Sequence, residues 1–324
     1  MKVCMVHNEY GKPSGEEAVV ERSTSLLRHY GHTVVPYRRS SAEIEKMRWG
    51  KVKAFFSGLY SFRAKRDIAR IMQAENPDIV HIHNVYPFIS PSILGQCRSA
   101  GIPVVMTLHN YRLTCPSGLH LRDGRVCEKC RRRQEIWCIF HNCEGSLLKS
   151  LGYALRTWVA RRGRFFHRNV TLYITLTRFH RNRLIADGLP SERAVVVPNP
   201  FSPDGLEKGD VMGDYVAFCG RVSKEKGISD LLTAATRLPG IEFRFAGEQD
   251  EGLDLSESAP DNCRFLGHLK RDSLGEFYKQ SRFVVLPSRW FEAFPCILLE
   301  AMYSGKPVVC SNIAGLPEIV EDGE

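Results

Sequence analysis

Two carboxylates with seven residues between them, Glu292 and Glu300, are the first candidates for a binding site. They lie in the stretch 289–302, which follows the apolar run 283–286. The run predicts a strand and the stretch predicts a short loop and a buried helix, with Pro295 in the first helical turn, where a missing N–H costs nothing. Free amides at such a helix start attract phosphates and sugar hydroxyls. The pattern therefore predicts a ligand site, although structural ion pairs of both glutamates fit it equally well.

A second cluster carries positive charge. Arg221 and Lys226 lie between Gly220 and Gly227, after the strand-like run 215–219 and before a helical pattern. The cluster therefore follows the carboxyl end of a strand, which is where open α/β sheets bind their ligands. Two cations framed by glycines at this position indicate a site for a pyrophosphate.

Together these segments resemble the donor-binding half of retaining glycosyltransferases with the GT-B fold, in glycosyltransferase family 4. The residues that carry the resemblance are Gly220-Arg221, Lys226-Gly227, the pair Glu292 and Glu300, 305–309 leading into 315–318, 197–199 and 265–267. The likeness covers nearly the whole chain. It implies an α/β protein of the GT-B class, with two Rossmann-like, doubly wound parallel-sheet domains facing a cleft. We expect an acceptor-side domain over 1–200 and a nucleotide-sugar-binding domain over 201–324.

The resemblance also implies a role for each charged residue. Arg221 and Lys226 would neutralise the departing diphosphate, which stabilises charge that grows in the transition state without a catalytic metal. Glu300 would accept hydrogen bonds from the ribose hydroxyls, because a carboxylate can accept two at once. Glu292 would hold hydroxyls of the donor sugar. The expected donor is thus a nucleoside-diphosphate sugar, and no cofactor is expected for catalysis.

Further contacts with the donor follow from the same resemblance. The backbone amides of Phe294, Cys296 and Ile297 would help to hold the donor sugar, and His109 would touch it near the reaction centre. Taken alone, a histidine at a strand end is more often structural. Retention of the configuration of the transferred sugar could arise by double displacement through a carboxylate nucleophile, as in retaining glycosidases. The resemblance favours front-face attack, in which the leaving phosphate deprotonates the acceptor and Glu292 only positions the sugar.

The N-terminal half alternates strand-like and helix-like patterns. Continuous apolar runs at 2–7, 78–83 and 103–109 suit parallel strands that are covered on both faces. Gly15 lies between the first run and a helix, where its backbone could approach an anion or a sugar, or simply form a β-α turn. Asn199 lies in the turn-rich linker expected between the domains, where it could line their cleft or serve only the turn.

An insertion at about 112–145 in the first domain is rich in cysteine. Its cysteines are Cys115, Cys127, Cys130, Cys138 and Cys143, and they include one C-x-x-C knuckle. Four thiolates would make a closed tetrahedral zinc site, which holds a loop and does no chemistry. A redox dithiol or plain buried thiols are the alternatives. Some members of the family resemble this sequence at Cys115, Cys127, Cys130 and Cys143, so the resemblance implies these four as ligands of a structural zinc.

The chain is basic, with a net charge of +9 and a pI of about 9.0. An anionic partner is therefore expected, whether a nucleotide sugar, a membrane surface or a nucleic acid. Aromatic and cationic residues alternate from Arg48 to Arg70, which suits an anionic membrane interface. An amphipathic helix packed on its own domain is the alternative.

A nucleic-acid-binding protein is a second possible class of function, but no recognised RNA or DNA module supports it, and no nucleic acid is expected. A third class is another GT-B activity, such as a nucleotide-sugar epimerase.

Composition and the two chain ends indicate the number of domains and the cellular location. A length of 324 residues with 43% hydrophobic residues fits a globular protein of two domains. The N-terminus turns polar too early for a signal peptide, and no apolar run approaches ~18 residues, so a cytoplasmic protein is expected, with access to the inner face of the membrane. Family members usually continue beyond the point where this sequence stops, so a C-terminal truncation is expected. The expected acceptor is a lipid-linked or polysaccharide intermediate of cell-surface glycan synthesis.

Overall fold

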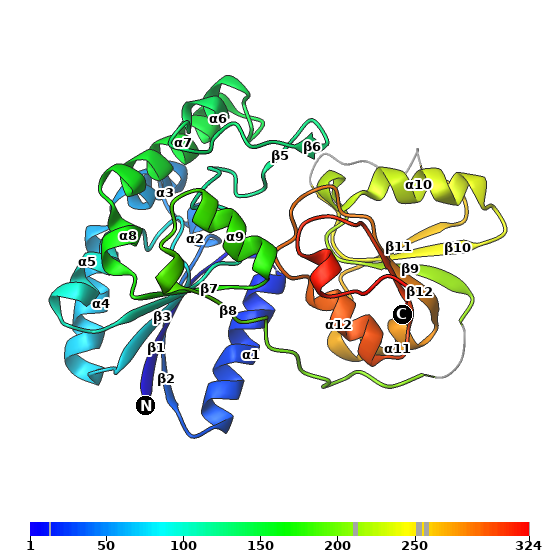
Figure 1. Cartoon of the computed structure of the whole chain (residues 1–324), viewed down its shortest axis with the longest axis horizontal. Coiled ribbons are helices and arrows are strands. Elements are labelled where there is room, and N and C mark those ends of the chain that lie inside the picture. Colours follow the sequence, from blue (N-terminus) through cyan, green and yellow to red (C-terminus); the bar gives the residue numbers. More distant parts are fainter. Residues whose placement is uncertain (13, 210–212, 251–254, 256–258, 324) are drawn as a thin grey trace. The chain divides into compact units, whose positions relative to one another are not determined.

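The computed structural model describes residues 1–324 except 13, 210–212, 251–254, 256–258 and 324. The chain forms two compact units. The first unit comprises Met1–Leu119 and Glu128–Pro200, and the second comprises His120–Cys127 and Phe201–Glu324. Each unit is built on one parallel β-sheet with helices packed around it (Figure 1). Part of the cysteine-rich insertion, His120–Cys127, therefore groups with the second unit.

The sheet of the first unit has six strands in the order β2-β1-β3-β4-β7-β8, with parallel neighbours throughout. Its strands are β1 (Lys2–Glu9), β2 (Thr33–Ser40), β3 (Ile79–Asn84), β4 (Val104–Thr107), β7 (Leu172–Thr175) and β8 (Ala194–Val196). The helices are α1 (Gly15–His29), α2 (Glu43–Lys46), α3 (Gly50–Leu59), α4 (Phe62–Glu75), α5 (Ser92–Ser99), α6 (Ile136–Phe140), α7 (Leu147–Arg162), α8 (Phe165–Asn169) and α9 (Arg178–Ala186), with a 3-10 turn at Ser191–Arg193. The central strand β1 is buried along nearly its whole length, as its continuous apolar run predicts.

The sheet of the second unit has five parallel strands in the order β11-β10-β9-β12-β13. Its strands are β9 (Tyr215–Cys219), β10 (Glu242–Ala246), β11 (Cys263–Gly267), β12 (Ser281–Leu286) and β13 (Val308–Cys310). The helices are α10 (Ile228–Arg237), α11 (Arg271–Lys279) and α12 (Cys296–Tyr303), with 3-10 turns at Lys224–Lys226 and Leu316–Glu318. A small antiparallel hairpin joins β5 (Leu121–Arg122) to β6 (Arg125–Val126). Alternate residues of β9 enter two different core clusters, so the sheet is covered on both faces.

The predicted fold class is confirmed, since both units are parallel α/β structures. The strand β9 has the bounds that the apolar pattern predicts. The loop between β12 and α12 is also found as predicted, but Pro295 lies directly before the first helical residue instead of in the first turn. Its backbone is extended there (φ −77°, ψ 107°), so it ends the loop.

Two stretches of the first unit are each divided into two helices. The helix α7 ends at Arg162 and α8 begins at Phe165, because Gly163 is followed by Arg164 in the left-handed conformation (φ 51°). The stretch Arg48–Arg70 divides between α3 and α4, because the Ser61 hydroxyl accepts a hydrogen bond from the Ala64 amide and caps α4.

Strand order identifies where each sheet can bind a ligand. In the second unit the chain passes from β9 outward to β10 and β11, and then returns to the other side of β9 to form β12 and β13. The direction reverses between β9 and β12. In the first unit it reverses between β1 and β3 in the same way. Open α/β sheets bind ligands at such switch points, outside the carboxyl ends of the strands.

Candidate functional site

The loops that follow β9 and β12 meet at the switch point of the second unit. The Arg289 amide donates a hydrogen bond of 2.8 Å to the Glu225 carbonyl and so joins the two loops. Gly227 has φ +75°, and a Cβ atom there would lie 2.0 Å from the Pro287 carbonyl oxygen. Only glycine allows both this backbone conformation and this close approach. The glycine in the cationic motif is therefore needed to bring the two predicted motifs together.

Lys226 and Glu292 form the centre of this site. The Lys226 ammonium donates to Glu292 Oε1 at 2.6 Å, and both side chains are largely buried, with 15% and 5% exposed. The same oxygen accepts hydrogen bonds from Ser288 Oγ at 2.6 Å and from the Trp290 indole N–H at 2.8 Å. Three donors thus hold one carboxylate oxygen in place. The pair can present a fixed cation to a phosphate beside an oriented carboxylate.

Arg221 lies at the entrance of the site. Half of its side chain is exposed, and its guanidinium pairs with Glu225 and approaches Asp250 at 3.6 Å. Ion pairs of such an exposed guanidinium contribute little to stability, so Arg221 can turn toward an incoming anion at little cost. The structure therefore supplies one buried and one accessible cation from the same loop.

Glu300 is the second buried carboxylate, on α12. Its Oε1 accepts a hydrogen bond from Arg271 Nη1 at 2.7 Å, and its Oε2 accepts one from Tyr278 Oη at 3.2 Å. Arg271 is itself held by the backbone carbonyls of Ser202 and Asp204. The sequence analysis did not find Arg271 or Tyr278, because neither belongs to a motif near Glu300. Glu292 and Glu300 therefore each form an ion pair, as the alternative of structural ion pairs expects.

The backbone amides predicted to hold a sugar surround the start of α12. Cys296 and Ile297 are its first two residues, and Phe294 lies in the preceding loop. All three are half-buried. Their predicted contact with a donor stays a prediction.

A group of histidines occupies the switch point of the first unit. His83 Nδ1 lies 2.8 Å from His109 Nε2, and the two rings stack with centroids 5.1 Å apart. His7 and His81 complete the group beside His83, at ring distances of 6.4 Å and 4.4 Å. Burial, followed by the neighbouring histidines, lowers the pKa of His109 to about 3. His109 is therefore neutral near pH 7 and can exchange a hydrogen bond with a hydroxyl but cannot supply positive charge. Its predicted role at the donor sugar stays a prediction.

Glu16 joins this group from the start of α1, and the sequence analysis missed it. Its Oε2 accepts a hydrogen bond from the Tyr10 hydroxyl at 2.8 Å, and its Oε1 lies 3.8 Å from His7 Nδ1. Neither Glu16 Oε1 nor either ring nitrogen of His7 has a hydrogen-bond partner within the described residues, although all are buried. Buried polar atoms without partners are rare, and at a switch point they indicate room for ligand hydroxyls.

The protonation of Glu16 gives a test of this arrangement. Burial raises its pKa to about 7. Because the folded chain holds this proton more tightly than the unfolded chain, its contribution to stability is complete below the unfolded pKa and is lost as the pH rises toward 7. Between pH 5 and pH 8, we expect the free energy of unfolding of the wild type to fall by up to about 3 kcal/mol more than that of Glu16→Gln. Urea unfolding of both proteins at each pH measures the difference. An identical pH dependence would show that Glu16 is ionised in the folded chain.

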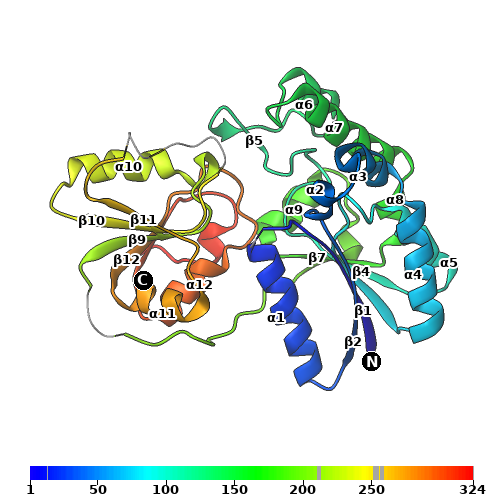
Figure 2. The ribbon, with the colours of Figure 1, turned by 180° about the vertical axis from the view of Figure 1, so that it is seen from behind.

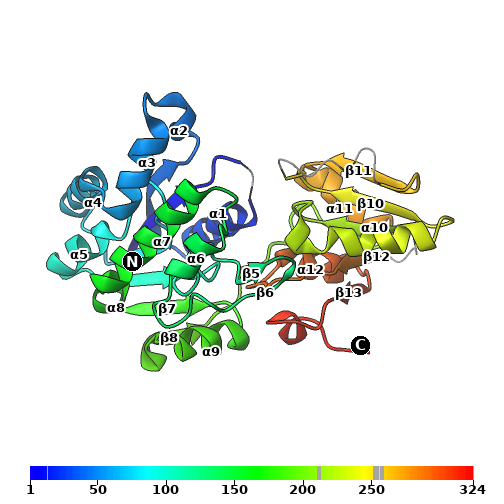
Figure 3. The same cartoon turned by 90° about the horizontal axis from the view of Figure 1, so that it is seen from above.

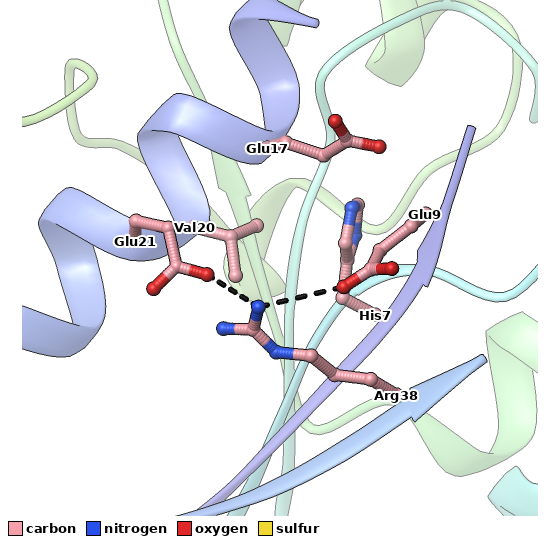
Figure 4. A pocket seen from close by; sticks show the side chains of 6 residues that line it. All are labelled: His7, Glu9, Glu17, Val20, Glu21 and Arg38. Carbon is pink, nitrogen blue, oxygen red and sulfur yellow. Dashed lines mark hydrogen bonds and ion pairs between the residues drawn. The ribbon is translucent and has the colours of Figure 1, made fainter. Parts of the chain in front are cut away.

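A cavity of about 270 Å³ adjoins the same end of α1. Figure 4 shows its lining, which is His7, Glu9, Glu17, Val20, Glu21 and Arg38. Arg38 donates to Glu21 and, at 3.5 Å, to Glu9, so its positive charge is already shared between two carboxylates. The cavity is therefore net acidic and rich in acceptors, which suits hydroxyl groups and disfavours anions.

The two remaining predicted binding residues have less specific surroundings. Gly15 is the first residue of α1, after the capping residue Ser14, and nothing lies within 4 Å of a Cβ atom built on it. The fold does not require glycine there, and the space beside the helix start is open. Asn199 is buried, 8% exposed, in the segment that follows β8. Ligand contacts of both residues stay predictions.

The cysteines of the insertion are thiols and not disulfides. Cys115, Cys130, Cys138 and Cys143 belong to the first unit, whereas Cys127 ends the segment that groups with the second. The Cys143 thiol, through a hydrogen bond, and burial raise the pKa of Cys138, and Cys130 and Cys115 add to the rise. Within the described part of the chain, no group of three or more His, Cys, Asp or Glu side chains is arranged to hold a metal ion. The predicted zinc site stays a prediction.

Two family models match the chain. The model for glycosyltransferase family 4 matches residues 13–204, and the model for group 1 glycosyl transferases matches residues 208–324. Among curated relatives, an uncharacterized 42.6 kDa protein in the cps region of Klebsiella pneumoniae is 24% identical over 265 residues, 81% of this chain and 64% of that protein. The O-antigen chain mannosyltransferase B of Escherichia coli is 30% identical over 176 residues, 47% of this chain and 46% of the relative.

Solved structures resemble the whole chain in fold. The Anabaena protein Alr3699/HepE in complex with UDP and glucose has a TM-score of 0.65 at 16% identity, covering 100% of this chain and 84% of that one. Sucrose-phosphate synthase from Thermosynechococcus elongatus has a TM-score of 0.68 at 14% identity, covering 97% and 82%. The curated relatives are longer: this chain spans 64%, 41% and 62% of the length of three of them.

Proposed function

The chain belongs to glycosyltransferase family 4, and we propose that it transfers a sugar from a nucleoside-diphosphate sugar to a hydroxyl-bearing acceptor with retention of configuration. The observation that carries the proposal is the contact between Lys226 and Glu292 at the switch point of the second unit. It joins the two motifs that the sequence analysis assigned to the diphosphate and to the donor sugar. UDP in the complex of the Anabaena protein, which shares the fold, supports the choice of donor class.

In the proposed reaction the second unit holds the donor. The ammonium of Lys226 and the guanidinium of Arg221 neutralise charge on the departing diphosphate, so that protein cations replace a catalytic metal. Glu300 accepts hydrogen bonds from the ribose hydroxyls, which requires Arg271 to share or leave it. Glu292 orients the donor sugar through its second oxygen, since Oε1 is occupied by Lys226, Ser288 and Trp290.

Retention is assigned to front-face attack. The carbon–oxygen bond to the diphosphate breaks, the acceptor hydroxyl attacks from the same face, and its proton passes to a leaving phosphate oxygen. Glu292 Oε1 accepts three hydrogen bonds, which lowers its nucleophilicity and supports a positioning role. Trapping of a glycosyl adduct on Glu292 would contradict this assignment.

The acceptor is proposed to be a lipid-linked or polysaccharide intermediate of cell-surface glycan synthesis. The relatives support this class, since one is encoded in a cps region and another is an O-antigen chain mannosyltransferase. In the first unit, the unpartnered atoms of His7 and Glu16 and the acidic cavity beside them offer acceptors and donors for sugar hydroxyls. The first unit is therefore proposed to bind an uncharged part of the acceptor.

Turnover of the donor tests the proposal. The purified chain is incubated with UDP-, GDP- and ADP-linked sugars and with extracted lipid-linked oligosaccharides, and the released nucleoside diphosphate is measured by a coupled assay. We expect acceptor-dependent release from sugars of one nucleotide, unaffected by EDTA. The anomeric configuration of the product, read by NMR, reports retention. An inverted product, or loss of activity that only a divalent cation restores, would contradict the mechanism.

A structural zinc is proposed on Cys115, Cys127, Cys130 and Cys143, which form no disulfide among the described residues. Their thiolates would have to draw together, and the site would hold the insertion without taking part in the reaction. We expect one zinc per chain by elemental analysis of protein purified without chelators, with loss of the metal in Cys130→Ser. Cys97→Ser, which removes a buried cysteine of α5, is the control. Folded, metal-free wild-type protein would refute the site.

A further inference from the structure

The solvent-facing side of α7 is apolar. Leu148, Leu151 and Trp158 follow one another at helical spacing, and their exposed fractions are 72%, 41% and 52%. The opposite side, which includes Ser150 and Thr157, is buried. A helix on the surface of a water-soluble domain normally has the reverse arrangement. The orientation of α7 therefore indicates that something other than water covers it.

Two neighbouring helices extend this apolar surface. Both α3 and α6 pack against α7, and the three helices lie together in all three views of the chain (Figures 1, 2 and 3). On α3, Val52 and Phe56 are 48% and 62% exposed, while the small residues of that helix are buried. On α6, Ile136, Trp137 and Phe140 are exposed. We name the exposed apolar residues Val52, Phe56, Ile136, Trp137, Phe140, Leu147, Leu148, Leu151 and Trp158 the α7 face.

Cations surround the α7 face. The exposed lysines of α3 and α7 are Lys51, Lys53 and Lys149. Within the described residues none of these three side chains forms an ion pair. No acidic residue occurs between Lys46 and Arg66 or between Ser146 and Asn169. Like charges gathered without counter-ions raise the local positive potential, so the expected partner is anionic.

We propose that the α7 face binds the surface of a bilayer that contains anionic lipid. Exposed aromatic and aliphatic side chains enter the boundary between headgroups and acyl chains, while the lysines meet lipid phosphates. Among the described residues, no helix is long and apolar enough to cross a membrane. The inference is independent of the donor site and adds a partner for the first unit.

The α7 face overlaps only in part with the stretch Arg48–Arg70, whose sequence suits a membrane interface, because only the α3 part of that stretch belongs to the face. The larger share comes from α6, in the cysteine-rich insertion, and from α7. This gives the insertion a role that a metal site alone does not explain, since it holds α6 against α7.

Vesicle co-sedimentation tests the proposal on the full chain. Phosphatidylcholine vesicles with and without phosphatidylglycerol are mixed with wild type, Leu151→Asp and Leu26→Asp in the absence of nucleotide. Leu26 is the matched control, because it is a leucine of α1 in the same unit and is 47% exposed. We expect the wild type to bind the vesicles in a salt-sensitive way that requires phosphatidylglycerol. The partition coefficient of Leu151→Asp should be about tenfold lower, because a leucine side chain gains free energy on entering the lipid boundary and a carboxylate does not. Leu26→Asp should bind like wild type.

Two further readouts keep the test decisive. A blue shift of tryptophan emission on vesicle binding, reduced in Trp158→Phe, would support insertion at α7, and circular dichroism would confirm that every variant is folded. No binding to anionic vesicles, or equal weakening by both aspartates, would overturn the proposal. So would ultracentrifugation showing a dimer that Leu151→Asp dissociates, since the face would then be covered by a second copy. Failure to bind nucleotide would contradict the proposed function without affecting this result.

Discussion

Replacing Lys226 with alanine is expected to lower kcat by roughly 10²–10³-fold, the usual cost of removing one preorganised group that stabilises developing charge. Lys226 is largely buried, so its ammonium acts on the diphosphate with little screening by water. The KM for the donor should change less, because the charge on the leaving group is greatest in the transition state. Steady-state kinetics at saturating donor measure the effect.

The neighbouring lysine provides the control. Lys224 lies on the same 3-10 turn, is exposed and forms no ion pair within the described residues. Lys224→Ala should retain the kcat of the wild type. Because Lys226→Ala also leaves Glu292 buried beside only neutral donors, urea unfolding must show that the variant is still folded. A folded Lys226→Ala protein with undiminished kcat would mean that the Lys226–Glu292 pair is only structural.

Glu300→Gln is expected to weaken nucleotide binding by about 10–100-fold. A carboxylate that accepts hydrogen bonds from hydroxyls contributes about 1.5–3 kcal/mol for each bond, and an amide keeps the volume but only part of this energy. The variant leaves Arg271 without its carboxylate, although the carbonyls of Ser202 and Asp204 still hold it. Isothermal titration with nucleoside diphosphates measures the change.

Two comparisons separate binding from stability. Glu276→Gln changes an exposed carboxylate on α11 of the same unit and should bind nucleotide like the wild type. Unfolding of Glu300→Gln in urea reports the cost of losing the contact with Arg271. If Glu300→Gln binds nucleotide as tightly as the wild type while its stability falls, Glu300 serves α11 and not a ribose.

The sequence predicted the motifs because each is local. Strand, loop and helix signals surround Arg221 and Lys226, and others surround Glu292 and Glu300. The alternation of strand and helix patterns also predicted that the two motifs would lie close together, because a parallel sheet puts the carboxyl ends of its strands on one edge. What the sequence could not supply was strand order, which decides that β9 and β12 are neighbours.

Contacts over long sequence separations were missed for the same reason. Tyr278 and Arg271 reach Glu300 from α11, and no pattern in α11 singles them out. His7 was read only as the end of a buried strand, and Glu16 only as part of a helix start. A buried histidine at the end of the strand before a Ser-Gly-Glu turn was the available signal for that pair.

The α7 face shows a different limit of sequence reasoning. An apolar stripe on a helix predicts which side is buried only when the rest of the helix is free to face water. In α7 the buried side combines polar and small apolar residues: the Ser150 hydroxyl donates to Asn142 Oδ1 at 3.2 Å, and Ala154 packs with Cys130 and Cys138. The pattern alone could not tell which side of the helix faces solvent.

The measurement that tests the central claim most directly is calorimetric titration of the chain with UDP, GDP and ADP. We expect saturable binding of one of the three nucleotides, and tighter binding of the sugar conjugate of that nucleotide. The affinity should fall in Glu300→Gln but not in Glu276→Gln. Absence of binding by all three to a folded chain, or equal binding to wild type and Glu300→Gln, would contradict a donor site at β9 and β12.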